Sequence, residues 1–142
     1  MLRITKCMEG FAMSVEIGMK GRAEAVVTQE NTAQAVGSGL VPVFATPYMI
    51  ALMENAAVQA VQPALAADEG TVGTRLDVTH DAATPVGMKV WAEAEVTAVE
   101  GRKLTFTVTA YDEAGKIGGG SHERFIIKTE KFLARAQAKA NA

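Results

Sequence analysis

The chain has 142 residues, the size of one domain, and 49% of them are apolar, which excludes a disordered chain. Its net charge of −2 arises from 14 basic and 16 acidic residues spread along the sequence, so neither nucleic acid nor an anionic membrane is expected as a partner. Cys7 is the single cysteine, so no intrachain disulfide can form. The sequence has neither an N-terminal apolar run nor a stretch of 18 apolar residues, so we expect one cytoplasmic domain over residues 1–142.

The N-terminal half contains few regular elements. Residues 1–20 form an N-terminal segment, and residues 21–28, "GRAEAVVT", end in β-branched residues that predict a strand. Residues 29–45 form a long loop, a type of segment that is often functional. The second half of this loop, "GLVPVFA", is apolar, so we expect it to pack over another part of the protein as a lid.

A helix is predicted to follow, over the stretch "TPYMIALMENAAVQAVQ". Thr46 is a suitable N-cap residue, Pro47 suits the first helical position, and Pro63 ends the pattern. Apolar residues lie on almost every side of this helix, which is typical of a buried helix.

The remainder of the chain alternates apolar and polar residues, as strands with one face on a core do. In residues 71–80, Val72, Leu76, Val78 and His80 share one face. Similar strands are predicted at residues 88–99, 104–111 and 116–128, with tight turns at "EGRK" and "DEAG", and residues 130–142 form a terminal helix.

The order of these elements predicts an α+β fold, with an antiparallel sheet of about five strands wrapped around one long buried helix. This arrangement is the hot-dog fold; a ferredoxin-like fold requires a second helix between strands, and the pattern contains none. A single five-stranded sheet leaves free edges, which favours pairing of two copies as a homodimer.

Glu54 lies in the middle of the apolar helix, where a carboxylate is costly unless it is paired or solvated. It either lies on a wetter stripe of the helix or forms part of a site. His80 faces the same core, and Thr46 adds a hydroxyl at the helix start. Alone, the histidine is explained by core packing and the threonine by capping. Together, the hydroxyl, carboxylate and imidazole favour an acyl-transfer site.

Other candidates are weaker. His122 has no cluster of metal-ligating residues around it, so no metal site is predicted. The "GGGS" run lacks the features of a phosphate-binding loop and indicates close packing or a bulge. Arg124 shares a face with His122 and Ile126, so it points inward as an ion-pair partner or a phosphate contact. Cys7 has no partner motif.

Four stretches resemble the hot-dog thioesterases of the fluoroacetyl-CoA thioesterase type: "VFATPYMIALMENAAVQA", "GTVGTRLDVTHDAATPVG", "VEGRKL" and "GSHERFIIKTEKF". The resemblance covers residues 39–139. It implies hydrolysis of acyl-CoA without a cofactor, by homodimers or dimers of dimers that bind acyl-CoA near the subunit interface.

The resemblance also implies roles for particular residues. The catalytic threonine, glutamate and histidine fall on Thr46, Glu54 and His80. A glycine N–H that holds the thioester carbonyl falls on Gly73, and an arginine near the site falls on Arg124.

Two lid residues, Leu40 and Phe44, are expected to contact substrate. Leu40 occupies the position of an aromatic gating residue in the fluoroacetate-specific enzyme, and a leucine cannot close a site in the same way. The resemblance therefore implies a general short-chain acyl-CoA thioesterase. There are two alternatives. One is a hydratase, which is favoured only by Asp81 beside His80. The other is a non-catalytic acyl-CoA-binding or sensing domain, which would keep the pocket without needing Glu54.

Overall fold

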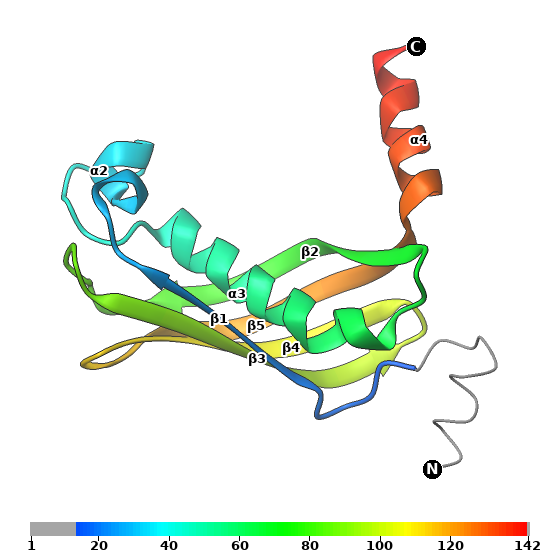
Figure 1. The fold of residues 1–142 in the computed structure, drawn as a ribbon, viewed down its shortest axis with the longest axis horizontal. Coiled ribbons are helices and arrows are strands. Elements are labelled where there is room, and N and C mark those ends of the chain that lie inside the picture. The colour runs from blue at the N-terminus through cyan, green and yellow to red at the C-terminus, as the bar shows by residue number, and fades with distance from the viewer. Residues whose placement is uncertain (1–13, 142) are drawn as a thin grey trace.

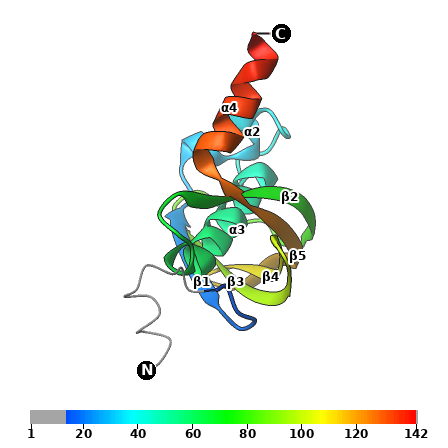
Figure 2. The same cartoon turned by 90° about the vertical axis from the view of Figure 1, so that its right-hand side faces the viewer.

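A computed structural model describes residues 14–141, so Cys7 lies outside the described residues. Five strands form one antiparallel sheet in the order β1-β3-β4-β5-β2, and the sheet curls around helix α3 (Figures 1 and 2). The predicted α+β class and strand order along the chain are confirmed. The elements are β1 (Lys20–Val26), η1 (Gln29–Asn31), α2 (Ala33–Val36), α3 (Thr46–Val61), η2 (Gln62–Ala64), β2 (Glu69–His80), β3 (Lys89–Glu100), β4 (Lys103–Asp112), β5 (Gly115–Lys128) and α4 (Thr129–Ala140).

Helix α3 is buried on one side only, which corrects the expectation of a helix buried all round. Met49, Met53 and Ala57 are fully enclosed by the sheet, whereas Tyr48 and Ala51 are exposed on the opposite side. The sheet of one chain covers one side of the helix, so the apolar residues on the other side remain uncovered. None of the described helices is long and apolar enough to cross a membrane.

The segment predicted as a loop at residues 29–45 contains two short helices, η1 and α2. The buried Thr32 hydroxyl accepts a hydrogen bond from the Ala35 N–H, and Gly37 ends α2 in the left-handed conformation with φ of 80°. This pair of caps explains how a helix of one turn forms there. Further along, Leu40 is 91% exposed, whereas Phe44 is buried at the base of the segment.

A β-bulge in β2 changes which side chains face the core. Gly73 pairs with Arg124 and Arg75 pairs with Glu123, so Thr74 is an extra residue between them. Before the bulge, Gly73 faces inward, so Val72 faces outward. After the bulge, Leu76, Val78 and His80 face inward. The prediction that Val72 shares a face with His80 is wrong, because the extra residue Thr74 interrupts the alternation.

Glycines allow two close contacts between the sheet and α3. A Cβ at Gly21 on β1 would overlap the backbone of Ala56 and Ala60. A Cβ at Gly118 on β5 would lie 2.9 Å from the Met49 sulfur. The packing interpretation of the "GGGS" run is confirmed by the second contact, and both contacts set the position of α3 over the sheet.

Candidate active site

Thr46 and His80 form a direct contact at the start of α3. The Thr46 Oγ1 and His80 Nδ1 atoms lie 2.7 Å apart. Ala45, not Thr46, is the N-cap residue of the helix, so the predicted capping role is wrong. Thr46 is the first helical residue, and because its hydroxyl does not cap the helix it is available to the imidazole at the end of β2.

The His80 ring is kept neutral near pH 7. Burial lowers its pKa from the ordinary value of 6.5, although the Ala82 backbone and the Asp81 carboxylate act in the opposite direction. Its Nε2 atom is buried and has no hydrogen-bond partner among residues 14–141. A neutral imidazole with one uncommitted nitrogen can accept or deliver a proton.

Glu54 lies in a second group, near the middle of α3. Its Oε2 atom is 3.2 Å from the Nη1 atom of Arg124, which is almost fully buried on β5. Arg124 also donates from Nε to the Thr71 hydroxyl at 2.9 Å and from Nη2 to the Thr71 carbonyl at 3.0 Å. These bonds fix the guanidinium, which in turn holds the carboxylate in one place. Arg124 therefore points inward as predicted, in an ion pair.

His122 completes this second group, although its sequence context gave no indication of a role. Its Nδ1 atom lies 2.8 Å from the Arg75 carbonyl, and its Nε2 atom lies 3.2 Å from Nη1 of Arg124. A carbonyl can only accept and a guanidinium can only donate, so these partners define the neutral tautomer with its proton on Nδ1. Burial also lowers the pKa of His122. The alternation on β5 predicts that His122 faces inward, and the strand register places it opposite Leu76, beside Arg75.

Gly73 lies directly against the Glu54 carboxylate. A Cβ at this position would overlap Oε2 of Glu54 and would lie 3.2 Å from Nη1 of Arg124. The absence of a side chain thus allows the carboxylate to approach the β2 backbone closely. Gly73, Glu54 and Arg124, which the resemblance assigns to one site, are in contact.

A cavity of about 310 Å³ opens next to the Thr46–His80 pair. Its wall includes Phe44 from the base of the lid segment together with Gly39 and Val41, but not Leu40. The Phe44 N–H donates to the Thr84 carbonyl at 2.9 Å. Of the two predicted lid contacts, Phe44 therefore lines the cavity and Leu40 points to solvent in this chain.

Thr84 and Asp112 anchor the loop between β2 and β3 that follows His80. Both are buried, and the Thr84 hydroxyl donates to Asp112 Oδ2 at 2.7 Å. The other carboxylate oxygen of Asp112 accepts the backbone N–H groups of Ala114 and Gly115. The pair ties the loop to the β4–β5 turn and, through Phe44, to the start of α3. Neither residue has a sequence pattern that could have identified it.

The Thr46–His80 pair and the Glu54 group are separate within one chain. Thr46 and Glu54 are eight positions apart on α3, which corresponds to about 12 Å along the helix axis. No hydrogen bond joins Glu54 to either Thr46 or His80 in the described part of the chain. The three predicted catalytic side chains therefore do not converge within a single copy.

Comparison with known proteins identifies the family. Residues 27–130 match the model of the fluoroacetyl-CoA-specific thioesterase family, which is more than half of the chain. The chain belongs to this family. Over 100 residues it is 49% identical to the fluoroacetyl-CoA thioesterase of Streptantibioticus cattleyicolor, an alignment that spans 70% of this chain and 72% of that protein.

Solved structures agree with this family assignment. The structure of the fluoroacetyl-CoA thioesterase FlK superposes with a TM-score of 0.83 at 39% identity, covering 89% of this chain and 98% of that chain. A thioesterase-superfamily protein from Thermus thermophilus superposes with a TM-score of 0.83 at 32% identity, covering 90% of this chain and 95% of that one. The hot-dog fold and the prediction of an acyl-CoA thioesterase are confirmed. The described residues contain no group of three potential metal ligands.

Proposed function

We propose that this thioesterase hydrolyses short-chain acyl-CoA in the cytoplasm, with Thr46, Glu54 and His80 as its catalytic residues. The observation that carries the proposal is the preorganisation of these side chains: Thr46 is bonded to a neutral His80, and Glu54 is fixed against Gly73 by Arg124. The relative from Streptantibioticus cattleyicolor is a fluoroacetyl-CoA thioesterase. Because a leucine at position 40 cannot close the site as an aromatic residue would, we assign this chain a broader range of small acyl groups that includes fluoroacetyl.

The residue types account for each step of thioester hydrolysis. Glu54 removes a proton from water as its oxygen attacks the acyl carbon, and the backbone N–H of Gly73 stabilises the developing oxyanion, an interaction of about 3 kcal/mol. When the carbon–sulfur bond breaks, a proton from solvent passes through His80 and the Thr46 hydroxyl to the thiolate of CoA, which leaves both side chains in their starting state. The proton on Glu54 then returns to solvent, leaving free acid and CoA.

The separation of the two groups within one chain supports a site formed by two subunits. Strand β2 is a sheet edge of 12 residues, and such an edge is suited to pairing with a second copy. A two-fold axis beside Leu76 would set Arg75 opposite Asp77 of the partner subunit, in a favourable charge pair that occurs twice.

The same register would complete the catalytic group. Because Thr74 is an extra residue, it places Val78 opposite Gly73 of the partner subunit, so His80, two residues further on the same face, would lie near Glu54 of the partner subunit. Each of the two sites in the homodimer would then take Thr46 and His80 from one subunit and Glu54, Gly73 and Arg124 from the other.

Thiol release from a panel of acetyl-, fluoroacetyl-, propionyl-, butyryl- and benzoyl-CoA tests the activity. Glu54→Ala and His80→Ala should each abolish turnover. If both variants stay fully active, the proposed catalytic residues are wrong.

Mixing the two inactive variants tests the shared site. After random subunit exchange, half of the dimers carry one of each variant, and one of their two sites is intact, so about one quarter of the wild-type activity should return. If each site lies within one chain, no activity returns.

A further inference from the structure

Helix α4 exposes an apolar stripe that the described chain leaves uncovered. Phe132 and Leu133 are 40% and 59% exposed, and Ala136 and Ala140 continue the same face at helical spacing. All twelve residues of the helix are exposed. Figures 1 and 2 show α4 projecting away from the sheet and past β2. These four residues are called the α4 stripe below.

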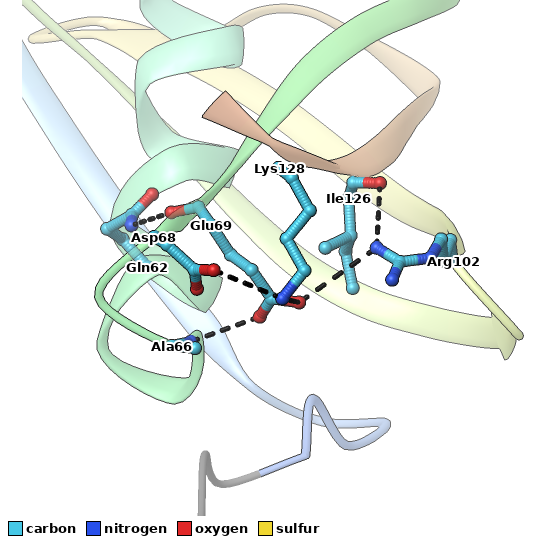
Figure 3. A network of polar contacts seen from close by, with 7 residues as sticks. All are labelled: Gln62, Ala66, Asp68, Glu69, Arg102, Ile126 and Lys128. Atoms are coloured by element: carbon cyan, nitrogen blue, oxygen red, sulfur yellow. Dashed lines mark hydrogen bonds and ion pairs between the residues drawn. The ribbon is translucent and has the colours of Figure 1, made fainter. Parts of the chain in front are cut away.

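The root of α4 is fixed to the start of β2. The Thr129 N–H donates to the Asp68 carbonyl at 3.0 Å, and Lys128 Nζ lies 3.3 Å from Asp68 Oδ2 and 3.6 Å from Glu69 Oε2 (Figure 3). The mostly buried Glu69 carboxylate also accepts from the Ala66 N–H at 3.1 Å and faces Arg102. With its first turn held by this network, α4 leaves the body of the protein in a defined direction.

A second exposed apolar surface lies at the opposite end of the molecule. In the lid segment, residues 29–45, Leu40 is 91% exposed and Val41 is 54% exposed, and Val36 at the end of α2 is also exposed. Figure 1 shows α2 and α4 projecting in the same direction from opposite ends of the molecule. Within one chain, the two surfaces are too far apart to cover each other.

Two copies related by a two-fold axis would bring these surfaces together. The axis beside Leu76 sets the start of β2, where α4 is rooted, next to residues that follow His80 in the partner subunit. Ala82 and Ala83 line the cavity together with the lid segment. The α4 helix of one subunit would therefore stand beside the cavity and lid of the other.

We propose that the α4 stripe of each subunit packs on the lid segment of the partner subunit and forms the outer wall of its acyl-CoA cavity. The proposal rests on the two-fold arrangement put forward under the proposed function, and it assigns α4 a role in substrate binding. Leu133 and Leu40 are the central contact, because they are the most exposed apolar residues of the two surfaces. Burial of both removes apolar area from water and keeps solvent out of the cavity.

Cross-linking tests the contact directly. In a Cys7→Ser background, Leu40→Cys and Leu133→Cys are combined and treated with a short bismaleimide, which links two thiols without any redox step. A covalent dimer is expected on a denaturing gel. Ala138, on the opposite face of α4, provides the control: Leu40→Cys combined with Ala138→Cys should stay monomeric on the same gel. A pair that cross-links equally well through Ala138, or not at all through Leu133, overturns the proposal.

Kinetics give a second, independent measurement. Leu133→Asp should raise KM for acetyl-CoA about tenfold, the effect of losing part of a buried leucine contact, while Ala138→Asp, on the opposite face, leaves KM unchanged. An unchanged KM for Leu133→Asp overturns the role of α4 in substrate binding.

Sedimentation and the mixing experiment separate the two proposals. A dimer that recovers activity on mixing but shows no Leu40–Leu133 cross-link refutes the α4 contact and leaves the shared site standing. A protein that sediments as a monomer refutes both.

Discussion

Replacing Gly73 with alanine should inactivate the enzyme while leaving it folded. The new Cβ would overlap Oε2 of Glu54, so the carboxylate must withdraw by about 1 Å to reach an ordinary contact distance. A displacement of this size at a reacting group costs about 100-fold in rate, equivalent to about 2.7 kcal/mol in the activation barrier. Glu54 is partly exposed and can rotate toward solvent, so the free energy of unfolding should change by only about 1 kcal/mol.

The assay is kcat/KM for acetyl-CoA from thiol release, measured beside urea unfolding. Gly70→Ala is the matched control, because Gly70 lies on the same strand and a Cβ there would meet only the Thr129 hydroxyl at 3.5 Å. The control should keep wild-type activity. A Gly73→Ala enzyme that is folded and fully active would show that catalysis does not depend on where the Glu54 carboxylate lies.

Three further predictions follow from individual contacts. Thr46→Val should lower kcat about 10- to 100-fold, because it removes the hydroxyl that contacts His80. The free energy of unfolding should change by less than about 0.5 kcal/mol, whereas a loss of about 1 kcal/mol would indicate that the hydroxyl caps the helix. Because burial lowers the pKa of His122, the imidazole binds a proton more readily in the unfolded chain than in the folded one. The free energy of unfolding should therefore fall as the pH drops below 6.5. Urea titrations at several pH values should show a smaller fall for His122→Gln. Thr84→Val should cost about 1–3 kcal/mol in urea unfolding by leaving a buried oxygen of Asp112 without its donor, and Thr84→Ser should restore most of the loss.

Most of the fold could be predicted because its physical causes are local. Alternating apolar residues define β3 and β4, and the turn between them requires a residue with positive φ, which Gly101 supplies at 63°. Pro63 ends the long helix close to the observed boundary at Val61. The helix–sheet order then leaves few possible topologies.

The errors arose where the structure depends on partners distant in the sequence. Apolar residues on all sides of α3 predict complete burial, but one face lies outside the sheet of a single chain. Thr46 matches a capping residue by type, and only the position of His80 in space shows that its hydroxyl is used elsewhere. Thr84 and Asp112 form their bond across 28 positions, so neither residue could be identified from its neighbours.

The placement of the site was predictable in part. The residue types and the family resemblance pointed to Glu54, Gly73 and Arg124, and the structure brings these three into contact. No sequence pattern indicated that Thr46 and His80 would form a separate group, because their distance from Glu54 depends on the geometry of α3 and β2. The sequence predicts no metal-ligand role for His122, and only the three-dimensional contacts show it bonded to Arg124.

The bulge at Thr74 also affects how the gene can change. Thr74 is an exposed residue whose hydroxyl donates to the Glu123 carbonyl at 3.2 Å, so many substitutions there should be tolerated. A three-nucleotide deletion of its codon would leave Gly73 and His80 six positions apart, so uninterrupted alternation along β2 would still turn both toward the interior. A second residue inserted beside Thr74 without a bulge of its own is different, because it would turn one of the two away, so selection can remove this residue more readily than it can add another.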